Sequence, residues 1–177
     1  MSPALGTHVV VDFDGTLTHL AVPWAALRDA LCVARIEDLW KDSDMGRWEA
    51  VTRAEVDAAG VAVPSEPVTT ALAGVPSLAI LTNNDETAVE RFLARYPELR
   101  ARVRLVVGRR SLAGPKTDFD VFSRGYRRCV AAVAPAGRPA SITYVGDMAY
   151  ELDFAQRLGA TAVAVTALQM TARDEAS

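Results

Sequence analysis

Two aspartates near the start of the chain, Asp12 and Asp14, have a spacing that suits carboxylate chemistry. Alternate residues of an extended strand point to the same side, so we expect the two carboxylates to lie close together. Such like charges are unfavourable unless one carboxyl is protonated or a cation is shared, and Mg²⁺ fits because it binds a few carboxylate oxygens plus water. A carboxylate can also attack phosphorus and form an aspartyl phosphate, while a second carboxyl transfers protons. Magnesium-dependent chemistry on a phosphate ester is therefore one interpretation of the pair.

The same stretch, Asp12-Phe13-Asp14-Gly15, is also typical of a turn or of a calcium-binding loop. Gly15 allows the chain to bend sharply directly after the pair. A calcium loop continues with Asp or Asn at the next alternate position and closes with a Glu, and neither follows here. A simple turn stays open as an alternative, so the other polar residues of the chain have to decide.

Three further stretches place polar groups where apolar runs end or helices begin. Thr82, followed by Asn83 and a helix start, offers a hydroxyl and unpaired backbone N–H groups to a phosphate. Lys116 offers a cation to a phosphoryl oxygen and offsets the charge of the aspartates. Asp147 can supply a further oxygen to a metal, and Glu151 lies one helical turn later on the same face. Taken singly, each has an ordinary alternative as a strand end, helix cap or solvated side chain.

Five short apolar runs, rich in β-branched residues, supply the elements that must position these groups. The runs are continuous rather than alternating, which is typical of strands buried on both faces of a parallel sheet. Apolar stripes with helical spacing lie between most of them. Strands that alternate with helices predict an α/β doubly wound fold, in which ligands bind beyond the carboxyl ends of the strands. The predicted strands are Val9–Phe13, Leu78–Thr82, Val103–Val107, Ile142–Val145 and Thr161–Val165.

Residues 20–66 interrupt this alternation and predict two helices. The first begins near Pro23, because proline is favoured at the first position of a helix. The second runs from about residue 45 to residue 59 and ends at Gly60. All three tryptophans of the chain fall in this segment, and we expect them to pack the two helices together; the alternative is that they contact a substrate directly.

Taken together, these residues resemble the haloacid dehalogenase superfamily of hydrolases that use an aspartate nucleophile. The most specific part is residues 9–18, Val-Val-Val-Asp-Phe-Asp-Gly-Thr-Leu-Thr, which is similar to the first motif of that family. Three further motifs follow in the family's order, so the resemblance spans nearly the whole chain. They correspond to Leu81-Thr82-Asn83, to Lys116 within Gly114-Pro115-Lys116-Thr117, and to Gly146-Asp147 followed by Glu151.

The resemblance implies a Rossmann-like, doubly wound core with a mainly parallel five-stranded sheet and a small helical cap. The core would consist of residues 1–19 and 67–177, and the cap of residues 20–66. The resemblance also implies that Asp12 attacks phosphorus and that Asp14 acts as general acid and base.

The binding groups follow from the same resemblance. The phosphoryl group is expected to be held by Thr82, Asn83 and Lys116. The expected Mg²⁺ ligands are the Asp12 carboxylate, the backbone carbonyl of Asp14 and the Asp147 carboxylate. Glu151 stands where many members have Asp, and we expect it to reach the metal through water.

By similarity, the cap covers the site, excludes water and selects the substrate. Basic residues in or near the cap, and one in the loop after the third strand, are candidates for contacting that substrate; the alternative is that they are surface residues. Arg109 has a second alternative, which is to brace the loop that carries Lys116. The candidates are His19, Arg28, Arg47, Arg53 and Arg109.

These expectations describe a Mg²⁺-dependent phosphatase that hydrolyses a small phosphomonoester through an aspartyl phosphate. A phosphomutase of the same superfamily would share every core residue, and a non-catalytic relative serving as a binding protein would share the fold. A dehalogenase attacks carbon and needs neither the Asp14 acid nor the metal site. Residues 108–117 resemble a nucleotide-binding P-loop, but the spacing is one residue too long and Pro115 lacks the backbone N–H that cradles phosphate.

The composition agrees with an enzyme that acts on a small molecule. The chain has 177 residues, which is room for one domain with a small insert. Its net charge of −3 gives no indication of nucleic acid or an anionic membrane as partner. No apolar run has transmembrane length, and the start of the chain, Met1 to His8, does not resemble a signal peptide. We therefore expect a cytoplasmic monomer or homodimer whose partner is a small phosphorylated metabolite.

Overall fold

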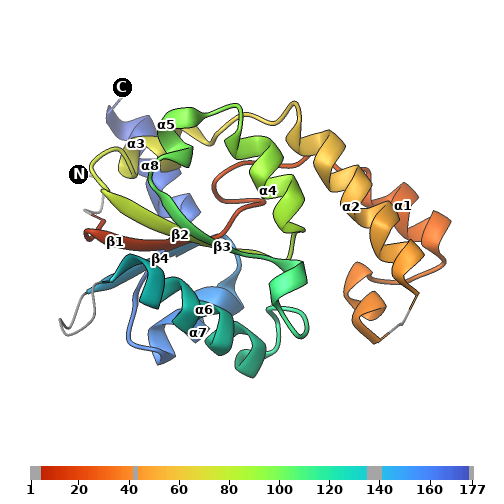
Figure 1. Cartoon of the computed structure of the whole chain (residues 1–177). Coiled ribbons are helices and arrows are strands. Elements are labelled where there is room, and N and C mark those ends of the chain that lie inside the picture. Colours follow the sequence, from red (N-terminus) through yellow and green to blue (C-terminus); the bar gives the residue numbers. More distant parts are fainter. Residues whose placement is uncertain (1–4, 42–43, 135–140, 176–177) are drawn as a thin grey trace.

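A computed structural model describes residues 5–41, 44–134 and 141–175. The chain forms a five-stranded sheet in the order β3-β2-β1-β4-β5, and all neighbouring strands are parallel. β1 lies at the centre, so its carboxyl end is flanked by those of β2 and β4 (Figure 1). The strands are β1 His8–Val11, β2 Ser77–Leu81, β3 Val103–Val107, β4 Ile142–Gly146 and β5 Thr161–Ala164.

Three of the predicted strands end slightly earlier than their apolar runs, which places polar residues in loops. The three valines of β1 are fully buried, as expected of a strand covered on both faces. β1 ends at Val11 and β2 at Leu81, so Asp12 and Thr82 lie directly beyond the strands. The loops, rather than the sheet, therefore aim these side chains.

Helices cover both faces of the sheet (Figure 1). One layer contains α3, α4, α5 and α8, and its apolar core includes Phe92; the other contains α6 and α7, with Phe122 in its core. This arrangement confirms the predicted doubly wound α/β fold. None of the helices in the described ranges is long and apolar enough to span a membrane. The bounds are α3 Glu66–Ala71, α4 Glu86–Leu93, α5 Pro97–Arg100, α6 Phe119–Val133, α7 Ala149–Arg157 and α8 Val165–Glu175.

The two helices that follow the loops of Thr82 and Lys116 begin at aspartate caps. The Asp85 carboxylate accepts a hydrogen bond of 2.9 Å from a backbone N–H in the first turn of α4. The Asp118 carboxylate accepts two such bonds, of 2.8 and 3.1 Å, at the start of α6. A cap of this kind satisfies N–H groups that have no partner within the helix, so it fixes where each loop ends.

We call residues 20–66 the cap segment. Its helices α1 and α2 lie beyond the carboxyl ends of the strands, in orange at the right of Figure 1, and residues 60–66 lead back to α3 beside the sheet. The sequence predicts two helices there, and the structure has α1 Trp24–Leu31 and α2 Met45–Ala59. It adds a 3₁₀ helix at Ile36–Lys41 that the sequence prediction lacks. With only six residues, this helix is too short to show a clear helical period.

The cap segment has a small apolar core of its own, made by Leu31, Leu39 and Val51. Trp24 and Trp48 pack against this core, and the Trp40 and Trp48 rings meet edge to face with centroids 5.3 Å apart. The tryptophans therefore pack the cap helices, as the sequence predicts, although all three also line the cavity described below.

α2 belongs to two apolar cores at once. Its first half contributes Val51 to the small core, whereas Ala58 and Ala59 near its end are buried in the core on the α4 side of the sheet. α2 also packs directly along α4. The helix therefore joins the cap segment firmly to the sheet that carries the polar loops.

Candidate active site

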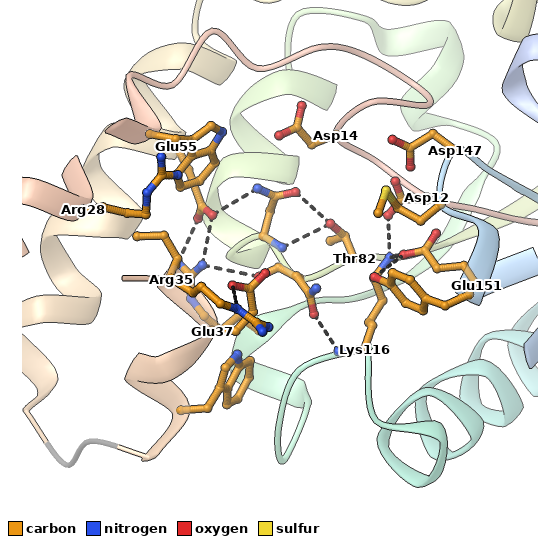
Figure 2. Close-up of a pocket in the computed structure, with 18 of the residues that line it drawn as sticks. Asp12, Asp14, Arg28, Arg35, Glu37, Glu55, Thr82, Lys116, Asp147 and Glu151 are labelled. Carbon is orange, nitrogen blue, oxygen red and sulfur yellow. Dashed lines mark hydrogen bonds and ion pairs between the residues drawn. The ribbon is translucent and has the colours of Figure 1, made fainter. Parts of the chain in front are cut away.

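The loops beyond β1, β2, β3 and β4 face the cap segment across a cavity of about 370 Å³ (Figure 2). Residues from all four predicted motifs line this cavity, together with two of the predicted substrate-contact residues. They are Asp12, Asp14, Thr82, Asn83, Lys116, Asp147 and Glu151, with Arg28 and Arg109. The structure thus brings together groups that are far apart in the sequence.

Lys116 lies at the bottom of this arrangement and is only 2 % exposed. Its ammonium group donates hydrogen bonds to Asp12 Oδ1 at 2.5 Å and to the backbone carbonyl of Leu81 at 3.0 Å. It also forms an ion pair of 2.6 Å with Glu151 Oε1. Burial by itself would lower the pKa of Lys116, but the two carboxylates outweigh it and raise that pKa, so the side chain is a permanent cation.

Asp12 is buried beside this cation, and yet its pKa lies above the ordinary value of an aspartate. Burial raises the pKa of Asp12 to about 7, against the opposing effect of Lys116. The carboxylates of Glu151 and Asp147 add to the rise. One ammonium group therefore does not balance the negative charge around it.

Three carboxylates, those of Asp12, Asp147 and Glu151, offer oxygens that all lie within 4.8 Å of one another. Among the described residues, Lys116 is the one cation in contact with this group, so the ionised cluster has surplus negative charge. Hard divalent cations prefer carboxylate oxygens, and a shared cation is the usual remedy for close like charges. Burial and the nearby Glu151 raise the pKa of Asp147, as expected of a carboxylate that lacks a counter-ion. The donor set fits Mg²⁺.

Gly15 shows how closely the first loop approaches Asp147. A Cβ atom at this position would lie 2.5 Å from Asp147 Oδ2, a contact shorter than Cβ atoms make in proteins. The backbone also has a φ of +86°, which glycine adopts easily and other residues do not. Both facts explain why glycine follows the two aspartates.

Two tyrosines hold Glu151 in place. The Tyr144 hydroxyl donates to Glu151 Oε2 at 2.9 Å, and the Tyr150 hydroxyl donates to Oε1 at 3.2 Å. Together with the ion pair to Lys116, these contacts engage both carboxylate oxygens. The arrangement suits a residue that positions the lysine, and it is compatible with the expected contact to a metal through water.

The Asp14 carboxyl group is not a member of the three-carboxylate cluster, contrary to the close Asp12–Asp14 pair that the sequence predicts. The prediction assumed an extended strand, but β1 ends at Val11 and the chain turns before Asp14. Asp14 Oδ1 accepts a hydrogen bond of 2.7 Å from the backbone N–H of Leu20, and Figure 2 shows the carboxyl group apart from the cluster. Burial raises the pKa of Asp14, and this hydrogen bond partly offsets the rise.

Thr82 and Asn83, the predicted phosphate ligands, have partners within the protein. The Thr82 hydroxyl donates to Asn84 Oδ1 at 2.8 Å and accepts from the Asn84 backbone N–H at 3.1 Å. Asn83 Oδ1 accepts from the backbone N–H of Lys116 at 2.8 Å. Asn83 therefore braces the lysine loop, which is the role that the sequence left as an alternative for Arg109.

Arg109 instead fastens the cap segment to the sheet. Its guanidinium group donates to both carboxylate oxygens of Glu55 in α2, at 2.9 and 2.8 Å. It also donates to Thr52 Oγ1 at 2.8 Å and lies 4.6 Å from the centroid of the Trp48 ring. Glu55 in turn accepts from Asn84 Nδ2 at 3.0 Å, so the cluster reaches the partner of Thr82.

The loop after β3, which resembles a P-loop in sequence, already binds an anion of its own chain. Its backbone N–H groups at residues 108, 110 and 111 each donate to the Glu86 carboxylate at 3.0 Å. These donors are occupied, so they do not form a phosphate cradle. The geometry therefore disfavours a nucleotide-binding loop at this position.

Comparison with known proteins finds similarity in structure only. No family model and no curated protein matches the chain. Solved structures do match, among them a candidate phosphoglycolate phosphatase from Lactobacillus plantarum, with 15 % identity, a TM-score of 0.62, and coverage of 93 % of this chain and 88 % of that one. The chain has the fold of the haloacid dehalogenase-like hydrolases.

Two further structures support the same haloacid dehalogenase-like fold. A candidate haloacid dehalogenase-like hydrolase from Bacteroides fragilis has 14 % identity and a TM-score of 0.61, with 89 % of this chain and 86 % of that chain covered. The candidate hydrolase YfnB from Bacillus subtilis, which was solved bound to magnesium, has 13 % identity and a TM-score of 0.56, with 89 % and 87 % covered. The resemblance seen in the sequence is thus confirmed at the level of the fold.

Within this haloacid dehalogenase-like fold, the predicted substrate-contact residues separate into two groups. Arg28 and Arg109 line the cavity, although Arg109 is engaged by Glu55. His19, Arg47 and Arg53 are not among the lining residues. His19 has an 85 % exposed side chain, Arg53 is exposed on α2, and Arg47 lies 3.8 Å from Asp44. Of these five predicted residues, only Arg28 lines the cavity without a hydrogen bond or ion pair from its side chain to another described residue.

Sequence reasoning missed Glu55 and the two tyrosines. Glu55 follows the buried Val51 by four residues and precedes the buried Ala59 by four, so it lies on the apolar stripe of α2. A charged residue on such a stripe needs a partner, and this spacing is the signal that could have identified it. Tyr144, in a fully buried strand, carries a similar signal, because a buried hydroxyl requires an acceptor.

Proposed function

We propose that this protein is a Mg²⁺-dependent phosphatase that hydrolyses a small phosphomonoester, with Asp12 as the nucleophile. One observation carries the proposal: a buried lysine bridges Asp12 and Glu151 at the floor of a cavity, beside a third carboxylate, Asp147. A divalent cation would neutralise the surplus negative charge of this cluster, and together with Lys116 it would offer positive charge to a phosphoryl group. The haloacid dehalogenase-like fold supports the same reading.

In the proposed reaction the Asp12 carboxylate attacks phosphorus. An acyl phosphate bond forms while the bond to the ester oxygen breaks, and Asp14 gives that oxygen its proton. Asp14 then removes a proton from water, whose oxygen attacks phosphorus and releases inorganic phosphate and the Asp12 carboxylate. The raised pKa of Asp14, caused by burial, supports a group that carries a proton at the start of the cycle.

The cation would be held by the Asp12 and Asp147 carboxylates, with the Asp14 backbone carbonyl as the third protein ligand that the family resemblance implies. When bound, Mg²⁺ supplies positive charge that neutralises the phosphoryl oxygens. Glu151 and its two tyrosine partners would hold Lys116 in position. Lys116 and the side-chain NH2 group of Asn83 would bind the phosphoryl oxygens, and Thr82 would join them by turning its hydroxyl away from Asn84 Oδ1.

The test is the release of inorganic phosphate from a panel of sugar phosphates, phosphoglycolate, nucleotides and amino-acid phosphates, with Mg²⁺ and with a chelator. The proposal expects turnover of at least one small ester that stops on chelation. Isomerisation of a substrate without release of phosphate would indicate a phosphomutase instead. Absence of any turnover across the panel would favour a non-catalytic binding protein.

A further inference from the structure

The cavity has a second end that the phosphoryl chemistry does not use. Its volume of about 370 Å³ falls within the range of roughly 300–1,000 Å³ that is usual for small-molecule pockets, so it has room for more than a phosphoryl group. The cap segment supplies the wall of this end, which lies across the cavity from Lys116 and Glu151 in Figure 2. The leaving group of a bound ester would therefore lie against the cap segment.

Arg28, in the last turn of α1, brings a positive charge to this wall. It differs from the other two arginines that line the cavity. Arg109 is engaged by Glu55, and Arg35 lies 3.6 Å from a carboxylate oxygen of Glu37. Among the residues that the structure describes, the half-buried Arg28 side chain makes no hydrogen bond, ion pair or ring contact. Its guanidinium group is therefore available to a ligand.

Trp24 lies one helical turn before Arg28, and both residues line the cavity. Residues four apart on a helix share a face, so α1 presents an indole and a guanidinium group side by side. An indole accepts a flat or apolar body, and a guanidinium group binds a carboxylate or phosphate through two parallel hydrogen bonds. The two side chains suit a ligand that has both features.

We propose that Arg28 binds a second anionic group on the leaving group of the substrate, while Trp24 packs against its apolar body. The inference rests on the proposed phosphatase function and names its substrate class: phosphomonoesters whose alcohol or phenol carries a further carboxylate or phosphate. Arg28 is then a specificity-determining residue, distinct from the groups that react with phosphorus.

The experiment compares 4-carboxyphenyl phosphate with 4-carbamoylphenyl phosphate, which have the same shape and differ by one charge. We expect the wild-type kcat/KM to be higher for the carboxylate by about tenfold or more, the effect of one hydrogen bond between charged groups. Arg28→Gln should remove this preference and leave the neutral ester within about twofold, and Arg28→Lys should restore part of it. Arg53→Gln is the matched control, because Arg53 is exposed and outside the cavity.

Binding by calorimetry to the Asp12→Asn variant, with and without Arg28→Gln, separates this inference from the phosphatase proposal. The same titrations on metal-free wild-type protein guard against misfolding of the variant. A preference for the anionic ligand that depends on Arg28 supports the inference even if no ester is turned over, which would overturn the phosphatase. Equal kcat/KM and equal affinity for the two esters would overturn the inference and leave the phosphatase standing. Benzene-1,4-diyl bisphosphate, used as a third ligand, shows whether a carboxylate or a phosphate is preferred.

Discussion

Lys116 and Arg109 are both buried cations at the same edge of the sheet, yet their surroundings differ in charge. Lys116 contacts two carboxylates, Asp12 and Glu151, and a third carboxylate lies beside them. Arg109 faces one close carboxylate, Glu55, in a two-pronged ion pair, with hydroxyl, carbonyl and indole groups around it. The first cluster has surplus negative charge, whereas the second is nearly balanced.

The difference in charge distinguishes a cluster that can bind a ligand or metal from a cluster that holds two elements of the protein together. A buried charge without a partner is costly, so a surplus persists in a folded protein mainly where a ligand or metal completes it. A balanced and fully hydrogen-bonded pair has nothing left to offer a ligand, and it fixes the position of the elements it joins. On this basis we assign the proposed chemistry to the Lys116 cluster, whereas the Arg109 cluster holds α2 against the loops of the sheet.

The largest expected effect is the loss of activity on replacing Asp12. Asp12→Asn keeps the shape of the side chain but removes the nucleophile, so phosphate release should fall by at least about 10³-fold. The measurement is the initial rate of phosphate release with Mg²⁺. Asp153→Asn is the matched control, because Asp153 is 63 % exposed on α7 and should leave the rate unchanged. Comparable turnover by Asp12→Asn would rule out the assigned role.

The next effect is on stability and falls in the other cluster. Glu55→Gln leaves the buried Arg109 without its close carboxylate, which should lower the free energy of unfolding by about 3 kcal/mol. Asp85 Oδ2, 3.9 Å from the guanidinium group, compensates in part. Urea denaturation measures the change, and a loss below about 1 kcal/mol would mean that the pair does not fasten the cap segment.

A somewhat smaller effect is expected from the metal. Mg²⁺ at about a hundred times its Kd should raise the free energy of unfolding of the wild type by about 2.7 kcal/mol, because it binds the folded state alone. Asp147→Asn should lose most of this gain, and Glu55→Gln should keep it. Equal gains in the two variants would place the metal outside the three-carboxylate cluster.

The pH dependence of stability gives a further contrast. Asp12 releases its proton near pH 7 when folded, whereas its ordinary pKa is 3.8, so between these values the folded state holds more protons than the unfolded state. The free energy of unfolding of the metal-free protein should therefore fall as the pH rises from about 4 to about 7. Asp12→Asn should flatten this fall when both proteins are unfolded by urea at each pH. The assignment would be contradicted if the free energy of unfolding of the wild type rose across this window, with the same slope as that of the variant.

The smallest effect is expected at a surface pair. Glu90 and Arg100 form an ion pair of 3.2 Å, but both side chains are about half exposed. Glu90→Gln should change the free energy of unfolding by less than about 1 kcal/mol. A loss as large as that of Glu55→Gln would show that burial does not distinguish the two pairs.

The gathering of these polar residues at one cavity could be predicted from the sequence because of where strands end. Asp12, Thr82 and Asp147 each follow a strand closely, and the carboxyl ends of parallel strands meet at one edge. Lys116 could be assigned because it stands between the second and the fourth motif, in the order of the family that the sequence resembles. The doubly wound fold followed from five continuous apolar runs.

Residues whose partners are set by tertiary contacts could not be predicted in this way. The pairing of Glu55 with Arg109 depends on how α2 packs along α4, and no local pattern encodes that packing. The position of Asp14 depends on a turn at Phe13, just beyond β1, which periodicity alone does not locate. The free guanidinium of Arg28 could be distinguished from the engaged one of Arg109 only by its surroundings.

The most direct test of the central claim is to trap the covalent intermediate at Asp12. Turnover with Mg²⁺ is stopped by acid, the protein is treated with borohydride, which reduces an acyl phosphate to an alcohol, and the peptide that contains Asp12 is analysed by mass spectrometry. The account predicts homoserine at residue 12 only when substrate and Mg²⁺ are both present. Phosphate release that proceeds with Asp12 unmodified, and with the reduced residue elsewhere or absent, would contradict it.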